Sequence, residues 1–482
     1  MKNQKLNLTM LMDLYELTMA NGIFTSDMKD NIAYFDMFFR RVPDNGGFAI
    51  MAGLQQLIDY LQDLHYEDSD IEYLESLNLF SEEFLEYLRN FKFDCDVWAV
   101  PEGTVIFPQE PIVTVRGNAM QALMLETMIL VTINHQSLIA TKANRIVRAA
   151  EGRPVMEFGA RRAHGNGAAY YGARAAIIGG CTGTSCVITA KDFGVKASGT
   201  MAHSWVQLFP DEYTAFKTYA EKYPDSCLLL VDTYNVIKSG IPNAIKVFDE
   251  VLKPLGKRPV GIRIDSGDIT YLTKKARQML DDAGYSDCKI CISNSLDEYL
   301  IRDMVSQGAK VDTYGVGERL ITARSEAVFG GVYKLSAVEN KGKIIPKIKI
   351  SENTAKITLP GVKIPWRLYD RETGKAIADV ITLGDEKIDS TEPYEIFDPV
   401  HTWKRKVVTN FVARKLQVKV FQQGRLVYEN PSVKEIADFC AEQVDVLWDE
   451  VKRFENPHTY YVDLSQKLWD LRHNMLTQLN IK

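Results

Sequence analysis

The 482-residue sequence lacks the surplus of positive charge that nucleic-acid-binding proteins carry. It has 57 Lys and Arg residues against 63 Asp and Glu residues, which gives a formal net charge of −6 at pH 7. Without a basic footprint, a nucleic-acid partner is not expected. Any anionic ligand must therefore be held by local groups and not by the overall field of the protein.

Cysteine and long apolar runs are scarce as well. Seven scattered cysteines do not suggest the disulfide framework of a small secreted protein. Cys288 and Cys291 have redox or zinc spacing, but without a second pair they are better explained as buried strand residues. The longest uncharged stretches, Thr127–Thr141 and Ala175–Ala190, are too short and too polar or Gly-rich to cross a bilayer. The N-terminal residues Met1–Leu6 are not an apolar signal peptide, so we expect a cytoplasmic protein without a membrane partner.

Common nucleotide-binding motifs are missing too. The sequence has no Gly-x-x-x-x-Gly-Lys-Ser/Thr loop, and Gly315-Val-Gly317 lacks the third glycine of a dinucleotide fingerprint. The pair Asp281-Asp282 is followed by Ala-Gly-Tyr and not by the Thr-Gly-rich loop of purine and pyrimidine phosphoribosyltransferases. Kinases, Rossmann dehydrogenases and those phosphoribosyltransferases are therefore not indicated.

What the sequence does contain is a repeated pattern of short apolar runs, mostly with room for a helix between them. Runs of this kind are typical of buried parallel strands, and eight in one segment predict an α/β barrel. Some of the gaps are short, so we expect an irregular barrel. The runs begin near Val155, Cys181, Val195, Leu228, Val260, Lys289, Val311 and Val332.

The segments on either side of this pattern differ from it. The first 95 residues or so read as mostly helical, and the chain after Lys341 is Lys-rich and β-like before it ends in amphipathic helices. Chain termini often pack together. We therefore predict an α/β protein in which residues 151–340 form the barrel, while residues 1–150 and 341–482 form an accessory α+β domain.

Polar and charged residues follow most of the apolar runs. In a parallel barrel the carboxyl ends of the strands share one face, which is where active sites are built. This pattern predicts an enzyme. The segments are Glu157–Arg162, Thr184-Ser185, Gly199–Trp205, Asp232–Asn235, Arg263–Asp268, Ser293–Ser295 and Tyr314–Glu318.

Two of these segments could bind an anion. Gly315 and Gly317 directly after a strand would let backbone N–H groups approach a phosphate closely, although a tight strand-to-helix turn would explain them equally well. Arg161 and Arg162 also follow a strand. An arginine there can bind a phosphate or carboxylate with two hydrogen bonds, but a surface pair is the alternative.

Two further segments could carry chemistry. Strand alternation places Arg263 and Asp265 on the same face, either as an internal ion pair or as ligands of an anionic or aromatic substrate and of a sugar diol or metal. His203 stands in a polar segment, and Asp232 ends the following strand. A carboxylate bonded to one imidazole nitrogen would leave the other as a nucleophile or base. No His or Cys spacing supports a zinc site.

Taken together, these motifs resemble those of the nicotinate phosphoribosyltransferase family. They occur in the family's order and cover nearly the whole chain, from about Leu8 to the C-terminal helices. The matching segments are Thr9–Ala20, Glu157-Phe-Gly-Ala-Arg-Arg162, Gly199-Thr-Met-Ala-His-Ser-Trp205, Gly261-Ile-Arg-Ile-Asp-Ser-Gly-Asp268, Ser293-Asn-Ser295 and Tyr314-Gly-Val-Gly317.

The resemblance implies an irregular α/β barrel with an accessory domain, working as a homodimer. The implied reaction of NAD salvage joins nicotinate to phosphoribosyl pyrophosphate and yields nicotinate mononucleotide and pyrophosphate. It also implies ATP as a co-substrate, hydrolysed through a phosphohistidine at His203, which Asp232 would orient. Mg²⁺ is implied with ATP and pyrophosphate, without assigned protein ligands.

By the same matching, Phe158 would stack on the pyridine ring and Arg263 would cover its other face. Thr200 would contact nicotinate, and Tyr15 would reach the ring from this subunit or from the second. The residues implied to bind phosphoribosyl pyrophosphate are Arg161, Ser293, Asn294, Gly315 and Gly317 for phosphate and Asp265 for the ribose hydroxyls.

Ser185 bears on the choice between an acid and an amide substrate. A nicotinamide-using relative has an aspartate at the matching position, where it can accept a hydrogen bond from the carboxamide. An aspartate would repel the carboxylate of nicotinate, whereas the hydroxyl of Ser185 can donate to it. The serine therefore favours nicotinate. The alternative from a different functional class is a barrel-shaped binding or scaffolding protein that has lost catalysis. A decayed site would be expected to lose some of its polar residues, but this sequence keeps His203, Asp232, Arg263 and Asp265.

Overall fold

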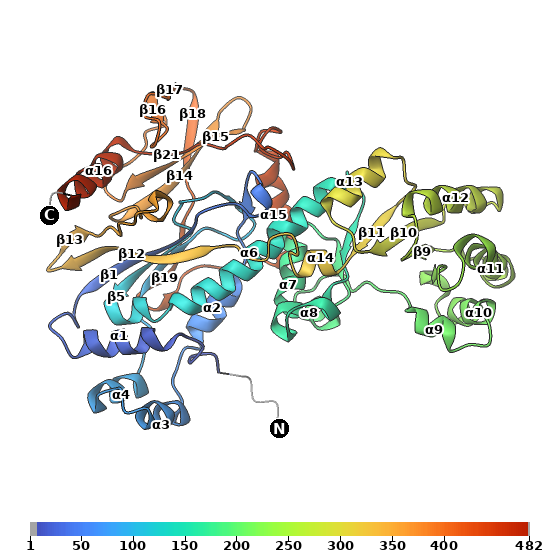
Figure 1. The fold of residues 1–482 in the computed structure, drawn as a ribbon, viewed down its shortest axis with the longest axis horizontal. Helices are drawn as coiled ribbons and strands as arrows, with labels where there is room; N and C mark the ends of the chain where they lie inside the picture. Colours follow the sequence, from blue (N-terminus) through green and yellow to red (C-terminus); the bar gives the residue numbers. More distant parts are fainter. Residues whose placement is uncertain (1–6, 481–482) are drawn as a thin grey trace. The chain divides into compact units, whose positions relative to one another are not determined.

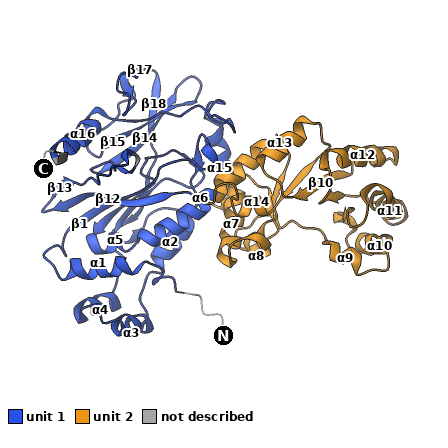
Figure 2. Ribbon diagram, viewed as in Figure 1, with its two compact units in different colours: residues 1–138, 328–431, 438–482 blue, residues 139–327, 432–437 orange. Residues whose placement is uncertain are grey.

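The computed structural model describes residues 7–480, and the chain divides into two compact units (Figure 1, Figure 2). Unit 1 contains the residues up to 138 together with 328–431 and 438–482, and unit 2 contains residues 139–327 and 432–437. The domain boundaries predicted from the sequence lie at residues 150 and 340, whereas the two units divide near residues 138 and 328. Residues 1–6, on which the expectation about a signal peptide rests, lie outside the described part of the chain.

A seven-stranded antiparallel sheet forms the core of unit 1. Seven of the eight residues of its strand β1 are buried, so β1 lacks the alternation of a half-exposed strand. Residues 7–95 contain four helices, in line with the expectation of a mostly helical head, but β1 is a strand that this expectation did not include. The strand order is β13 (Lys343–Pro346), β12 (Gly331–Asn340), β1 (Ile32–Phe39), β5 (Val113–Asn118), β3 (Asp96–Ala99), β19 (Val418–Gln422) and β20 (Arg425–Leu426).

Unit 1 also holds a four-stranded sheet and two short antiparallel pairs of strands. In the larger sheet β21 runs parallel to β15, while the other neighbours are antiparallel. Its order is β18 (Phe411–Lys415), β14 (Lys363–Asp370), β15 (Ala376–Leu383) and β21 (Val462–Leu464). The pairs are β16 (Tyr394–Phe397) with β17 (Arg405–Val408), and β2 (Ala49–Ile50) with β4 (Val105–Ile106).

Side chains cap the N-termini of several helices of unit 1. Ser81 is the N-cap of α4, and its hydroxyl accepts a hydrogen bond from the backbone N–H of Phe84 at 3.3 Å. The helices are α1 (Leu14–Phe24), α2 (Leu54–Gln62), α3 (Asp68–Ser76), α4 (Glu82–Arg89), α5 (Ala119–Leu123) and α16 (Gln466–Asn480). Two more, α6 (Glu126–Ala149) and α15 (Val433–Asp445), contain residues of both units.

One helical stretch, Ala119–Ala149, has the length and the apolar composition of a membrane span. However, 67% of its most apolar window is buried inside the protein. Core helices of globular proteins show this combination.

Unit 2 is built on a six-stranded sheet in which all neighbouring strands are parallel. Its order is β7 (Gly183–Thr184), β6 (Val155–Glu157), β11 (Thr313–Val316), β10 (Lys289–Asn294), β9 (Gly261–Ile264) and β8 (Leu228–Leu230). Its helices are α7 (Asn166–Ile178), α8 (Val187–Asp192), α9 (His203–Gln207), α10 (Glu212–Lys222), α11 (Ile241–Val247), α12 (Ile269–Asp282), α13 (Glu298–Ser306) and α14 (Glu318–Ile321).

The predicted α/β character is confirmed, but the strands that the structure describes form no closed barrel. The run near Val195 makes only an isolated bridge between Ala197 and Thr184. The run near Val332 belongs to β12, which pairs antiparallel with β1 in the sheet of unit 1. An apolar run indicates a buried strand, but it does not say to which sheet the strand belongs.

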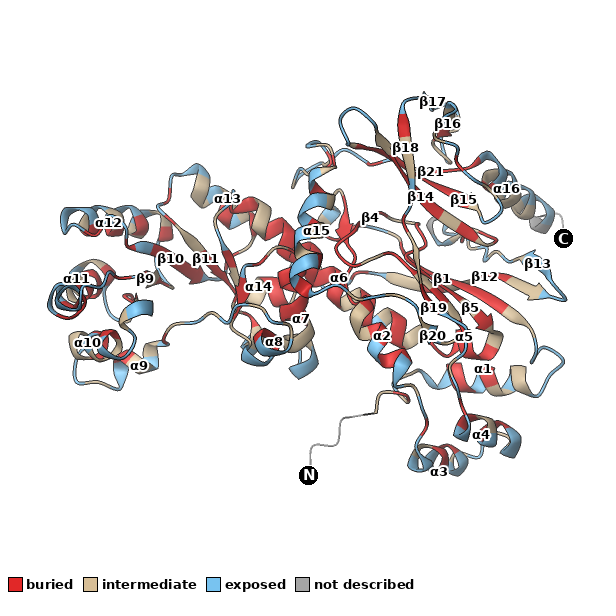
Figure 3. Ribbon diagram, turned by 180° about the vertical axis from the view of Figure 1, so that it is seen from behind, coloured by how far each residue is buried: buried red, intermediate tan, exposed pale blue. Residues whose placement is uncertain are grey.

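Burial follows the strands in each unit. Central strands such as β1, β5, β10 and β11 carry mostly buried residues, whereas helices such as α12 and α16 expose one face (Figure 3). All seven cysteines are free. Cys291 lies in β10 and Cys288 directly precedes this strand; both are buried, and burial raises the pKa of Cys291 to about 11. The prediction that they are buried residues of a strand region is therefore confirmed.

Candidate active site

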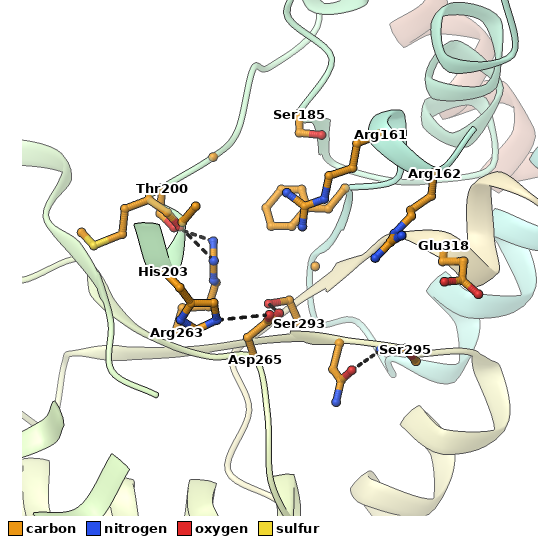
Figure 4. A pocket seen from close by; sticks show the side chains of 17 residues that line it. Arg161, Arg162, Ser185, Thr200, His203, Arg263, Asp265, Ser293, Ser295 and Glu318 are labelled. Carbon is orange, nitrogen blue, oxygen red and sulfur yellow. Dashed lines mark hydrogen bonds and ion pairs between the residues drawn. The ribbon is translucent and has the colours of Figure 1, made fainter. Parts of the chain in front are cut away.

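A cavity of about 380 Å³ opens in unit 2 where the parallel strands end (Figure 4). All but two of the predicted site residues line it; the exceptions are Tyr15 and Asp232. The lining residues that the sequence predicted are Phe158, Arg161, Ser185, Thr200, His203, Arg263, Asp265, Ser293, Asn294, Gly315 and Gly317.

The topology explains why these residues meet. Phe158, Ser185 and Asp265 each come directly after a strand, namely β6, β7 and β9. Ser293-Asn294 and Gly315 lie in the last residues of β10 and β11. Because neighbouring parallel strands end at the same edge of a sheet, five separate segments converge on one cavity.

Two glycines at the end of β11, Gly315 within the strand and Gly317 just after it, make room for Phe158. The backbone N–H of Phe158 donates to the carbonyl of Val316 at 2.7 Å, which brings its ring against β11. A Cβ at Gly315 would lie 2.5 Å from Cδ2 of that ring, and a Cβ at Gly317 would lie 3.1 Å from the Phe158 carbonyl oxygen. The glycines are thus required by close packing, and their contact with phosphate stays a prediction.

Arg263 reaches the cavity from β9 and is held by neutral acceptors. Its Nη1 donates to the hydroxyl of Thr200 at 2.6 Å, and its Nη2 donates to the carbonyl of Met201 at 2.9 Å (Figure 4). Its buried Nε has no hydrogen-bond partner. The internal ion pair with Asp265 that the sequence left open is not formed, so the guanidinium keeps its charge for a ligand.

His203, the first residue of α9, has two different neighbours. Its Nδ1 lies 3.1 Å from the hydroxyl of Thr233, and its Nε2 lies 3.8 Å from Oδ2 of Asp265. The predicted contact with Asp232 is not formed. Instead, Oδ2 of Asp232 accepts hydrogen bonds from the backbone N–H of Asp265 and the hydroxyl of Ser266, at 3.1 and 2.6 Å.

This correction has a local cause. Strand β8 ends at Leu230, and the residues that follow it are irregular until a helix begins at Val236. Outside a strand the alternation of side chains no longer holds, so the sequence could not decide which of two neighbouring residues faces His203. Thr233 is a site residue that sequence reasoning missed, and no signal beyond its place beside Asp232 pointed to it.

Asp265 and the end of β10 are joined by a hydrogen bond. The hydroxyl of Ser293 donates to Oδ1 of Asp265. The next residue, Asn294, has a φ of 135°, a strained value for a residue other than glycine. Its Oδ1 accepts a hydrogen bond from the backbone N–H of Ser295 at 2.7 Å. Strained backbone of this kind is concentrated at functional sites.

Two arginines enter the cavity from a short 3₁₀ helix, Ala160–Arg162, that follows β6. Neither Arg161 nor Arg162 forms an ion pair with any residue between 7 and 480. With Arg263 they set three guanidinium groups against the carboxylates of Asp265 and Glu318, and Glu318 is itself 3.2 Å from Arg324. The cavity is therefore locally positive in an acidic protein, which favours an anionic ligand.

Arg162 and Glu318 are lining residues that received no role from the sequence. For Arg162 the signal was present, because the arginine doublet was recognised as an anion site but only Arg161 was assigned. For Glu318 the only signal in the sequence was its position directly after Gly317.

Tyr15 lies on α1 of unit 1 and has 43% of its surface exposed. Partial burial and the neighbouring carboxylate of Glu126 raise the pKa of its phenol. Its contact with a pyridine ring stays a prediction.

No group of three or more His, Cys, Asp or Glu side chains within residues 7–480 is arranged to hold a metal ion. The carboxylates that line the cavity are Asp265 and Glu318. Mg²⁺ is commonly held by one or two carboxylates together with phosphate oxygens of a substrate. The lining residues therefore fit a Mg²⁺ ion that a phosphate ligand brings along.

Comparison with known proteins points to one family along nearly the whole chain. Residues 10–134 match the family model of the nicotinate phosphoribosyltransferase N-terminal domain, residues 154–375 that of the nicotinate phosphoribosyltransferase family, and residues 362–472 that of the C-terminal domain. A nicotinate phosphoribosyltransferase of Bacillus subtilis is 43% identical over 465 residues, which cover 96% of this chain and 94% of that protein.

Further relatives agree. The Mycobacterium tuberculosis protein described as nicotinate phosphoribosyltransferase pncB2 is 36% identical over 95% of this chain and 91% of its own length. The crystal structure of human nicotinic acid phosphoribosyltransferase superimposes with a TM-score of 0.84 at 28% identity, over 97% of this chain and 100% of that one. From the three matching segments and this extent of similarity, the chain belongs to the nicotinate phosphoribosyltransferase family.

Proposed function

We propose that this protein joins nicotinate to phosphoribosyl pyrophosphate, a step of NAD salvage, to give nicotinate mononucleotide and pyrophosphate. The observation that carries this proposal is the cavity at the strand ends. Residues expected for both substrates converge there, and three arginines face it without a carboxylate partner. Two anionic substrates need such a site.

The pyridine ring would lie between Phe158 and Arg263. An aromatic face and a guanidinium plane are good partners for a flat ring, and Arg263 is already fixed by Thr200 and Met201. The hydroxyl of Ser185 at the cavity wall can donate to the nicotinate carboxylate. An aspartate there would repel that carboxylate, so Ser185 supports the acid over the amide.

In the transfer step, the bond between C1 of the ribose and the pyrophosphate oxygen breaks, and the pyridine nitrogen forms the new bond to C1. The electron pair of the broken bond leaves with pyrophosphate. Arg161 and Arg162 would hold the leaving group, and Asp265 would hold the ribose hydroxyls. Most of the acceleration would come from positioning and charge stabilisation. Mg²⁺ bound with pyrophosphate would neutralise part of its charge beside Asp265.

ATP would be coupled through His203. When Nδ1 carries the proton, it donates to the hydroxyl of Thr233, and Nε2 keeps its lone pair toward Asp265. Attack of Nε2 on the γ-phosphate of ATP forms the N–P bond and releases ADP, and hydrolysis later returns free His203. The phosphoryl group would add negative charge and acceptor oxygens beside the substrate site. Thr233 would take the orienting role first expected of Asp232.

The proposal also covers the location and the oligomeric state of the enzyme. The enzyme would be a cytoplasmic homodimer, with Tyr15 placed to reach the pyridine ring of its own or the second subunit's site. The exposure of Tyr15 on α1 is compatible with such a role.

The test is mononucleotide formation from nicotinate and from nicotinamide, measured side by side with phosphoribosyl pyrophosphate and Mg²⁺, with and without ATP. We expect product from nicotinate, increased by ATP. The variant His203→Ala should lose the ATP stimulation and keep some basal turnover. Product from nicotinamide alone would overturn the assignment of the acid, and full stimulation of His203→Ala by ATP would overturn the role of His203.

A further inference from the structure

Glu157 is a buried carboxylate that directly precedes the lining residue Phe158 but does not itself line the cavity. It is the last residue of β6, and none of its surface is exposed. It forms no ion pair with any residue of the described range 7–480, and burial raises its pKa. Burying a carboxylate without a neighbouring cation costs free energy, and hydrogen bonds to its oxygens offset part of this cost. The two oxygens of Glu157 each accept one such hydrogen bond.

One oxygen of Glu157 anchors the segment that carries Ser185. It accepts a hydrogen bond from the hydroxyl of Thr184 at 2.6 Å. The same hydroxyl accepts from the backbone N–H of Cys186 at 2.9 Å. The N–H of Ser185 itself donates to the backbone carbonyl of Glu157 at 2.9 Å. Ser185 is thus fixed directly and through both of its neighbours.

The other oxygen of Glu157 anchors the segment that carries the two arginines. It accepts a hydrogen bond from the backbone N–H of Gly159. The carbonyl of Gly159 in turn accepts from the N–H of Arg162 at 2.7 Å, which starts the 3₁₀ helix Ala160–Arg162. A Cβ at Gly159 would lie 2.8 Å from the Glu157 oxygen and 2.5 Å from Cβ of Ile321, so only glycine allows this approach.

We propose that Glu157 is a positioning residue that sets the distance between the nicotinate-binding hydroxyl of Ser185 and the phosphate-binding arginines Arg161 and Arg162, while touching neither substrate. The proposal rests on the function proposed above. A single carboxylate connects the two substrate subsites because each of its oxygens serves one of them. Correct spacing matters, since a displacement of about 1 Å in a reacting pair can lower a rate about a hundredfold.

The experiment separates the two arms of Glu157. Thr184→Val removes the hydroxyl at nearly constant volume, and Thr184→Ser keeps it. We expect Thr184→Val to raise the KM for nicotinate about tenfold, with the KM for phosphoribosyl pyrophosphate within about twofold of the wild type. Thr184→Ser should stay close to the wild type in both. Glu157→Gln should raise at least one of the two KM values, because its single carbonyl oxygen can accept only one of the two hydrogen bonds and its –NH₂ can accept none.

Amide hydrogen exchange of the same variants gives a readout that does not depend on turnover. Segment 184–187 should exchange faster in Thr184→Val, and at least one of the segments 184–187 and 159–162 should exchange faster in Glu157→Gln. Equal rises of both KM values in Thr184→Val, or unchanged exchange of both segments in Glu157→Gln, would overturn the positioning role. If exchange changes as expected but the wild type makes no mononucleotide, the proposed function fails and the anchoring by Glu157 stands.

Discussion

Two arginines, Arg367 in unit 1 and Arg263 in unit 2, are used in opposite ways. Arg367 on β14 is fully buried, and its Nε and Nη2 donate to the two oxygens of Asp379 at 2.7 and 2.6 Å. Its guanidinium also lies against the rings of Phe107 and Tyr460. Arg263 has no carboxylate partner and donates only to a hydroxyl and a backbone carbonyl.

The difference shows how to separate structural from functional charge in this chain. An arginine neutralised in place by a bidentate carboxylate has no charge left for a ligand, and it connects β14 to β15 in unit 1. An arginine held by neutral acceptors is fixed in position but keeps its charge available. The predictions below change one side of this comparison at a time.

The largest effect is expected from Arg367→Met. Removing this guanidinium leaves the Asp379 carboxylate buried without a cation, which typically lowers the free energy of unfolding by about 3–5 kcal/mol. Urea unfolding measures the loss, and the kcat of the folded fraction should be unchanged. The double variant Arg367→Met/Asp379→Leu should recover most of the stability. A double variant as unstable as the single one would contradict this account.

The matching change in unit 2 is Arg263→Met. We expect kcat/KM for nicotinate to fall about a hundredfold or more, because the lost group is fixed and charged beside the ring. The free energy of unfolding should change by only about 1 kcal/mol, since no ion pair is broken. Arg263→Lys keeps the charge but not both donors, so its activity should lie between the two. A large loss of stability with normal turnover would mean that Arg263, like Arg367, has a structural role and does not bind the substrate.

These arginines also show what the sequence could and could not predict. The alternation along β9 correctly placed Arg263 and Asp265 on one face, and both line the cavity. The prediction that parallel strands end at one edge of a sheet also held, and most of the predicted residues line one cavity there. Thr233 was missed because it lies beyond the end of β8, where alternation stops.

The open sheet was missed for a different reason. The run at Val332 has the composition of a buried strand, and β12 is such a strand, but its partner β1 lies about 300 residues earlier in the chain. Pairing between distant segments depends on tertiary packing, which no local pattern records. The helical reading of the head failed at β1 because a strand covered on both faces does not alternate.

A smaller effect, on specificity, is expected from Ser185→Asp. The new carboxylate should repel nicotinate and accept a hydrogen bond from the amide of nicotinamide. We expect the ratio of kcat/KM for nicotinate to that for nicotinamide to fall about tenfold or more, which corresponds to about 1.4 kcal/mol. Ser185→Ala removes the donor without adding charge and should lower the rate with nicotinate only. An unchanged ratio in Ser185→Asp would remove Ser185 from the carboxylate subsite.

The last effect is visible only as a change with pH, and it concerns Asp463 of β21 in unit 1, a carboxylate with 4% of its surface exposed and no ion pair within residues 7–480. Burial, together with the nearby charge of Asp398, raises its pKa to about 7. The unfolded chain releases this proton near pH 4 and the folded protein only near pH 7, so the contribution of Asp463 to stability falls across this window. Asp463→Asn cannot ionise. Relative to the wild type it should gain stability between pH 4 and pH 8, by about 1.4 kcal/mol for each unit by which the folded pKa exceeds the unfolded one, measured by urea unfolding at both pH values. A difference that does not depend on pH would mean that Asp463 titrates normally, and that unit 1 contains no buried charge left unbalanced at this position.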